Sequence, residues 1–87
     1  MPVVNKRDLS VRYDFYVGRP TLLGNPFQIG PGIDRDRAIR LYRHYAIARM
    51  DMDENFRRAV LYCKGRTLAC WCVPLPCHAD VLLELAG

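Results

Sequence analysis

The chain has 87 residues, enough for one domain, and its 51% hydrophobic and 25% charged composition is that of a folded protein rather than a disordered one. No apolar run approaches the roughly 20 residues of a membrane span, and the N-terminus lacks the apolar stretch of a secretory signal, so we expect a cytoplasmic protein. The net charge is +4 and eleven of the thirteen basic residues are arginine, which favours an anionic partner such as a nucleotide or nucleic acid, although a solvated basic surface explains the same charge.

Two strands are expected in the first part of the chain, followed by an irregular segment. Residues 2–5 and 14–18 are rich in β-branched and aromatic side chains, and Gly18 ends the second run. Residues 19–33 hold three of the six prolines and three of the six glycines, so no regular helix or strand runs through them. Such a long connection in a small domain is typically functional or mobile.

The first helix is expected to begin at Asp34, whose side chain is suited to capping a helix. The apolar side chains of this helix recur at intervals of three and four, and they are Ala38, Leu41, Tyr42, Tyr45 and Ala48. A second helix is expected to begin near Asp53 and to end at Lys64-Gly65. Its buried stripe consists of Phe56, Ala59, Val60 and Cys63.

Residues 66–71 predict a third strand, with Leu68, Cys70 and Cys72 on one face and Ala69 and Trp71 on the other. Residues 77–86 predict a last, largely buried helix. This order indicates an α/β fold: residues 1–87 form one domain with a short, mostly parallel sheet of about three strands packed with about three helices. Ligands of such sheets bind at the carboxyl ends of the strands, here Gly18-Arg19 and Trp71-Cys72.

Three motifs carry a family resemblance. "YVGRP", "GNPF" and "LACWCVPLPCHADVLLEL" together resemble the domain of unknown function 4326 family, small proteins of bacteriophages and of bacteria with phage-derived genes. The resemblance extends from about Val3 to Ala86. It implies the cytoplasm of a phage-infected host cell and a defining role for the cysteine segment, and it brings no established reaction.

The cysteine segment allows three interpretations. Cys70, Cys72, Cys77 and His78 have the chemistry of four zinc ligands, but zinc sites usually separate paired cysteines by two to four residues. Alternatively, Cys77 at the start of a helix is a reactive thiol, assisted by the adjacent His78 or by His44 if it comes close. In the third interpretation the cysteines pack as small hydrophobic side chains, which suits Cys63 best.

The segment from 19 to 27 also has two interpretations. As a binding loop, Arg19 meets an anionic group, Asn25 bonds a base or amide edge, and Phe27 or Trp71 stacks on a ring. As a compact turn, the same segment holds Asn25 extended before Pro26 and buries Phe27. Neither a dinucleotide nor a P-loop fingerprint occurs.

Our leading hypothesis is a site at the strand ends that binds a nucleotide or a nucleic-acid-derived anion and processes it if the protein is an enzyme. Its ligand-binding residues are Arg19, Asn25, Phe27 and Trp71, and its catalytic residues are Cys72, Cys77 and His78. No cofactor is expected. The alternatives are a non-enzymatic, zinc-stabilised binding module and a small inhibitor that docks on a host protein. The leading hypothesis requires folding to bring the two motif-bearing loops together.

Overall fold

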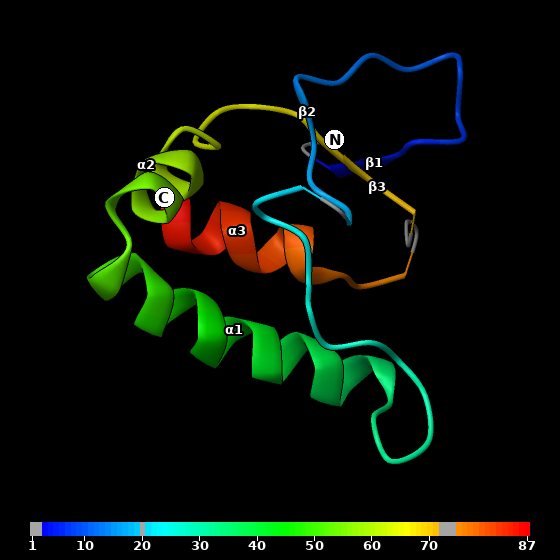
Figure 1. Cartoon of the computed structure of the whole chain (residues 1–87). Coiled ribbons are helices and arrows are strands. Elements are labelled where there is room, and N and C mark those ends of the chain that lie inside the picture. Colours follow the sequence, from blue (N-terminus) through cyan, green and yellow to red (C-terminus); the bar gives the residue numbers. More distant parts are fainter. Residues whose placement is uncertain (1–2, 20, 72–74) are drawn as a thin grey trace.

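The computed structural model describes residues 3–19, 21–71 and 75–87, and within these residues it contains three strands and three helices (Figure 1). In chain order they are β1 (Val3–Asn5), β2 (Phe15–Tyr16), α1 (Arg35–Met52), α2 (Glu54–Leu61), β3 (Leu68–Cys70) and α3 (His78–Ala86). The predicted α/β fold is therefore confirmed. None of the helices found in the described ranges is long and apolar enough to cross a membrane.

The sheet is built around β3, which lies between β1 and β2 and is parallel to both. Leu68 is the partner of Val3 on one side and of Phe15 on the other. Because all three strands run the same way, they all end at one edge of the sheet. Residues that follow the strands, such as Lys6 and Trp71, therefore leave the sheet on the same side of the molecule.

One face of the sheet carries the core. Partners across a parallel pair share a face, so Leu68 lies with Val3 and Phe15, and all three contribute to the hydrophobic cluster. Figure 1 shows α3 between the sheet and α1, and α3 packs against β3, α1 and α2. The buried apolar residues of α3 explain this central position, and they are Ala79, Val81, Leu82 and Ala86.

The buried face of α1 matches the predicted stripe fully only at Ala38 and Tyr42, since Leu41 and Tyr45 are half-buried and the buried Ala46 was not predicted. Ala38, Tyr42 and Ala46 are buried, whereas Ala48 is exposed, so its place in the predicted stripe is wrong. Residues four apart stay on one face of a helix, and Ala48 lies two positions beyond that row. In the second helix the prediction is confirmed for Phe56 and Val60.

The strands are shorter than predicted, but their hydrogen bonding extends further. Regular strand covers 15–16 rather than 14–18, and 68–70 rather than 66–71. The backbone N–H of Asp14 nevertheless donates to the carbonyl of Thr67 at 2.8 Å, and that of Val17 to Ala69 at 3.0 Å. The first strand begins at Val3, and the predicted Pro2 lies outside the described residues.

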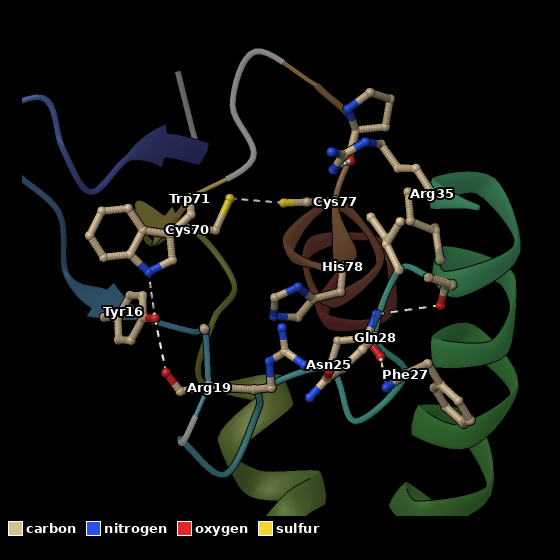
Figure 2. A pocket seen from close by; sticks show the side chains of 15 residues that line it. Tyr16, Arg19, Asn25, Phe27, Gln28, Arg35, Cys70, Trp71, Cys77 and His78 are labelled. Carbon is tan, nitrogen blue, oxygen red and sulfur yellow. Dashed lines mark hydrogen bonds between the residues drawn. The ribbon is translucent and has the colours of Figure 1, made fainter. Parts of the chain in front are cut away.

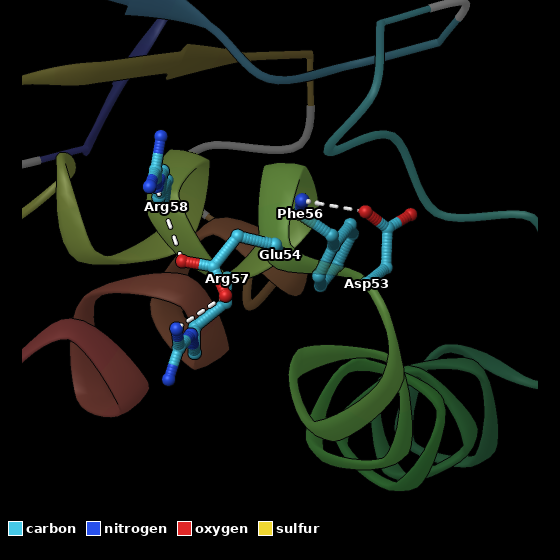
Figure 3. Close-up of polar contacts among 5 residues, drawn as sticks. All are labelled: Asp53, Glu54, Phe56, Arg57 and Arg58. Carbon is cyan, nitrogen blue, oxygen red and sulfur yellow. Dashed lines mark hydrogen bonds and ion pairs between the residues drawn. The ribbon is translucent and has the colours of Figure 1, made fainter.

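The junction of α1 and α2 depends on Asp53 (Figure 3). Asp53 ends α1 and caps α2, because its carboxylate accepts the backbone N–H of Phe56 at 3.1 Å. This hydrogen bond is the main cause of the lowered pKa of Asp53. Glu54 then pairs with Arg57 and Arg58 on the exposed side of α2. The sharp turn lets Phe56 enter the core directly after α1.

Tyr42 connects α1 to the irregular segment before it. The side chain is fully buried, and its hydroxyl donates to the backbone carbonyl of Leu23 at 2.7 Å. Its ring also lies edge-on to His78, with 5.0 Å between ring centroids. The segment from 19 to 33 is thereby held against the core by a buried polar contact, and burial raises the pKa of Tyr42.

Replacing Tyr42 with phenylalanine should lower the free energy of unfolding by about 1–3 kcal/mol, because a buried carbonyl of Leu23 loses its donor. Urea denaturation followed by circular dichroism measures this loss. Tyr62→Phe is the matched control: Tyr62 is exposed, and its variant should stay within about 0.5 kcal/mol of the unaltered protein. Equal effects of the two substitutions would contradict the role of Tyr42.

Candidate functional site at the carboxyl edge of the sheet

A pocket of about 420 Å³ lies where the strand ends meet the first turns of α1 and α3 (Figure 2). The residues singled out by the sequence that line it are Arg19, Asn25, Phe27, Cys70, Trp71, Cys77 and His78. The two motif-bearing loops thus share one hollow, as the leading hypothesis requires. Cys72, the remaining predicted site residue, lies outside the described residues.

One wall of the pocket consists of Tyr16 and Trp71, which hydrogen bonds connect between the ends of β2 and β3. The indole N–H of Trp71 donates to the Tyr16 hydroxyl at 2.8 Å, and that hydroxyl donates to the carbonyl of Arg19 at 3.0 Å. Gly18 permits this arrangement, because a Cβ there would collide with the ring and hydroxyl of Tyr16. The "YVGRP" motif therefore has a steric reason for its glycine.

The GNPF segment forms a second wall through Asn25. The amide oxygen of Asn25 accepts the backbone N–H of Phe27 at 2.8 Å, and its amide nitrogen donates to the carbonyl of Ala38 in α1 at 3.4 Å. Phe27 packs edge-on against Tyr45, with centroids 6.0 Å apart. These contacts support the compact-turn interpretation of Asn25 and Phe27, although both residues also line the pocket.

Arg35 is a pocket residue that the sequence reasoning missed. It begins α1, and its guanidinium donates to the carbonyl of Pro76 at 3.3 Å, which joins α1 to the segment before α3. The predicted helix cap at Asp34 could have indicated Arg35, since the residue after the cap is the first residue of the helix and lies at its N-terminus. Within the described ranges, neither Arg35 nor Arg19 takes part in an ion pair.

His78 lies at the start of α3 with only 8% of its surface exposed. Its Nε2 is 2.7 Å from the carbonyl oxygen of Val17, and because a carbonyl only accepts, Nε2 carries the proton. Burial is the largest cause of the lowered pKa of His78, and the charge of Arg19 lowers it further. The hydrogen bond to Val17 and the charge of Asp80 oppose the shift. The ring is therefore a neutral imidazole near pH 7.

Cys70 and Cys77 meet at the base of the pocket, with their Sγ atoms 2.9 Å apart. Both side chains are buried, and Cys77 is the cap residue of α3, with its backbone N–H donating to the Asp80 carboxylate at 3.2 Å. Two thiolates on one tetrahedral zinc ion lie farther apart, at about 3.8 Å. Within the part of the chain that the structure describes, no three His, Cys, Asp or Glu side chains group as metal ligands.

The remaining cysteine, Cys63, lies outside this segment and is fully buried in the hydrophobic cluster. Its thiol contacts the carbonyl oxygen of Ala59 at 3.4 Å, and burial raises the pKa of the thiol. This confirms the packing interpretation for Cys63.

Comparison with known proteins places the chain in a family. It matches the domain of unknown function DUF4326 over residues 4–87 and belongs to that family. It is 31% identical over 85 residues to the "Uncharacterized 12.4 kDa protein in nrdA-td intergenic region" of Enterobacteria phage T4, an alignment that covers 98% of this chain and 76% of the phage protein. No solved structure matches the chain. The family resemblance is thus confirmed, and neither name states a reaction.

The lowered pKa of His78 predicts a pH dependence of stability. The unfolded chain takes up a proton near the usual pKa of 6.5, before the folded protein does, so the free energy of unfolding should fall as the pH drops from about 7.5 to 5.5. Urea denaturation at each pH measures this slope. His78→Gln should flatten it, whereas the exposed His44→Gln should leave it unchanged. A slope that survives in His78→Gln would contradict the assignment.

Proposed function

We propose that the pocket binds a nucleotide or another nucleic-acid-derived anion. The observation that carries the proposal is the combination of two guanidinium groups, Arg19 and Arg35, with an aromatic wall of Tyr16 and Trp71 around one hollow. Neither arginine is neutralised by an ion pair among the described residues. Guanidinium groups suit phosphate oxygens, and aromatic rings suit the faces of bases.

The pocket residues have different roles in this binding. Arg19 and Arg35 bind the anionic group, and Trp71, which is 47% exposed, offers a ring at the pocket rim. Asn25 and Phe27 shape the wall through their contacts with α1 and Tyr45. The pocket volume lies within the range of small-ligand sites, about 300–1,000 Å³.

Processing of the ligand is the part of the proposal that involves Cys72, Cys77 and His78. Because Nε2 of His78 donates to Val17, Nδ1 is the nitrogen that retains a lone pair and can accept a proton. Among its partners, Cys77 contacts the thiol of Cys70 and the carboxylate of Asp80.

Trp71 provides the test, since it is the single tryptophan of the chain and lines the pocket. Titration with nucleoside monophosphates, with inorganic phosphate as a second probe, should change its fluorescence in a saturable way. Arg19→Ala or Arg35→Ala should weaken binding about tenfold or more, as expected for the loss of a charge-assisted hydrogen bond.

Lys64→Ala is the control with the same change of charge, because Lys64 is exposed and precedes β3 at the opposite edge of the sheet. It should bind like the unaltered protein. The proposal fails if no nucleotide changes the fluorescence, or if Lys64→Ala weakens binding as much as Arg19→Ala does.

A zinc-stabilised module is the second candidate, because the thiols of Cys70 and Cys77 lie side by side, and zinc binding would move their Sγ atoms from 2.9 Å to about 3.8 Å apart. Zinc would be held by these residues with Cys72 and with Nδ1 of His78, which retains a lone pair while Nε2 donates to Val17. Metal analysis of the purified protein tests it. About one zinc per chain, lost with folding on chelation, supports the zinc module. A folded protein without zinc excludes it.

A further inference from the structure

Two cations lie beside the pocket without lining it. Nζ of Lys6 is 5.0 Å from the centroid of the Tyr16 ring and 5.4 Å from that of Trp71, and Cζ of Arg7 is 5.2 Å from the Trp71 ring. Tyr16 and Trp71 form the pocket wall, whereas Lys6 and Arg7 are not among the lining residues. The cations therefore lie just outside the wall that encloses the pocket.

Asn5 holds this pair of cations in place. Its side-chain oxygen accepts the backbone N–H of Arg7 at 2.9 Å, and its side-chain nitrogen donates to the carbonyl of Trp71 at 3.4 Å. The backbone N–H of Lys6 donates to the carbonyl of Cys70 at 2.9 Å. The end of β1 is thus fixed to the end of β3, and a preorganised cationic pair loses less entropy when an anion binds.

Neither cation of this pair forms an ion pair with an acid among the described residues. The ion pairs within the described ranges involve helical arginines together with Glu54, Glu84 and the α1–α2 junction residue Asp53, and none involves Lys6 or Arg7. The nearest acid in sequence, Asp8, is a carboxylate whose pKa is lowered by hydrogen bonds from the hydroxyl and backbone of Ser10, so it keeps its negative charge but is directed to Ser10 and forms no ion pair with Lys6 or Arg7. Lys6 and Arg7 therefore extend the positive field of the pocket past Trp71.

We propose that Lys6 and Arg7 form a second phosphate subsite and that the ligand is a single-stranded oligonucleotide. One nucleotide occupies the pocket, and the adjoining phosphodiester lies against Lys6 and Arg7. This inference rests on the proposed function of the pocket and adds the class of ligand. The pocket of about 420 Å³ is at the small end of the range of ligand sites, so we expect it to take one nucleotide, and the next phosphate of the strand then lies outside it, beside these two cations. Binding of this kind needs backbone phosphates and does not require a particular sequence.

The test compares three probes by fluorescence anisotropy: a labelled mixed-sequence tetranucleotide, and unlabelled nucleoside monophosphates and triphosphates as competitors. The tetranucleotide should bind about tenfold or more tightly than the monophosphates, because each additional phosphate contact releases counterions. The variant Lys6→Gln with Arg7→Gln should lose that advantage and bind monophosphates as before. Its salt dependence should become shallower by about 1.4 in the log–log slope, for two lost contacts.

The matched control is Lys64→Gln with Arg66→Gln, two exposed cations before β3 at the other edge of the sheet, and it should retain the advantage. Glutamine keeps a long polar side chain, and circular dichroism verifies folding. A tetranucleotide that binds no better than a monophosphate overturns the second subsite while the proposed function stands. Triphosphates that bind as tightly as the tetranucleotide overturn the oligonucleotide assignment. If no probe binds, the proposed function itself is wrong.

Discussion

The site depends on the central position of β3 and on its parallel pairing with both neighbours. With Leu68 opposite Val3 and Phe15, the three strands end together, and the chain leaves the sheet three times along one edge. These strand ends place Arg19 and Trp71 around a common hollow, with Arg7 beside Trp71 outside its wall. An antiparallel β2 would send Arg19 to the opposite edge. The arrangement of charge and aromatic surface is therefore a consequence of strand direction.

A second constraint holds the long segment after β2 against this edge. Three contacts fix it: the Tyr42 hydroxyl with Leu23, Asn25 with Ala38, and the Tyr16 hydroxyl with the carbonyl of Arg19. Each contact joins the segment to a helix or a strand end. The pocket wall is thus supported by regular elements, which is the condition for a binding site with a fixed shape. His78 and Tyr42 link the two supports, since His78 bonds to Val17 and packs on Tyr42.

Much of this arrangement could be predicted from sequence, because the signals were local. Helical spacing and the capping residues predicted the helices, and the α/β order predicted parallel strands that end at one edge of the sheet. The cations at the end of β1 were missed because the prediction used the ends of only two strands, and which strands are neighbours depends on tertiary packing. Arg35 was missed for a similar reason: its contact with Pro76 joins residues 41 positions apart. The error at Ala48 arises because tertiary packing decides which side of α1 is buried, and spacing alone does not fix this.

The central claim is that the carboxyl edge of the sheet is a phosphate-binding surface, and amide chemical-shift mapping tests it most directly. A single-stranded tetranucleotide added to the ¹⁵N-labelled protein should shift the amide signals of Lys6, Arg7, Arg19, Trp71 and His78, in proportion to saturation. Signals from the opposite edge, such as Lys64 and Gly65, should stay in place. Shifts confined to that opposite edge, or no shifts at all, would contradict the account.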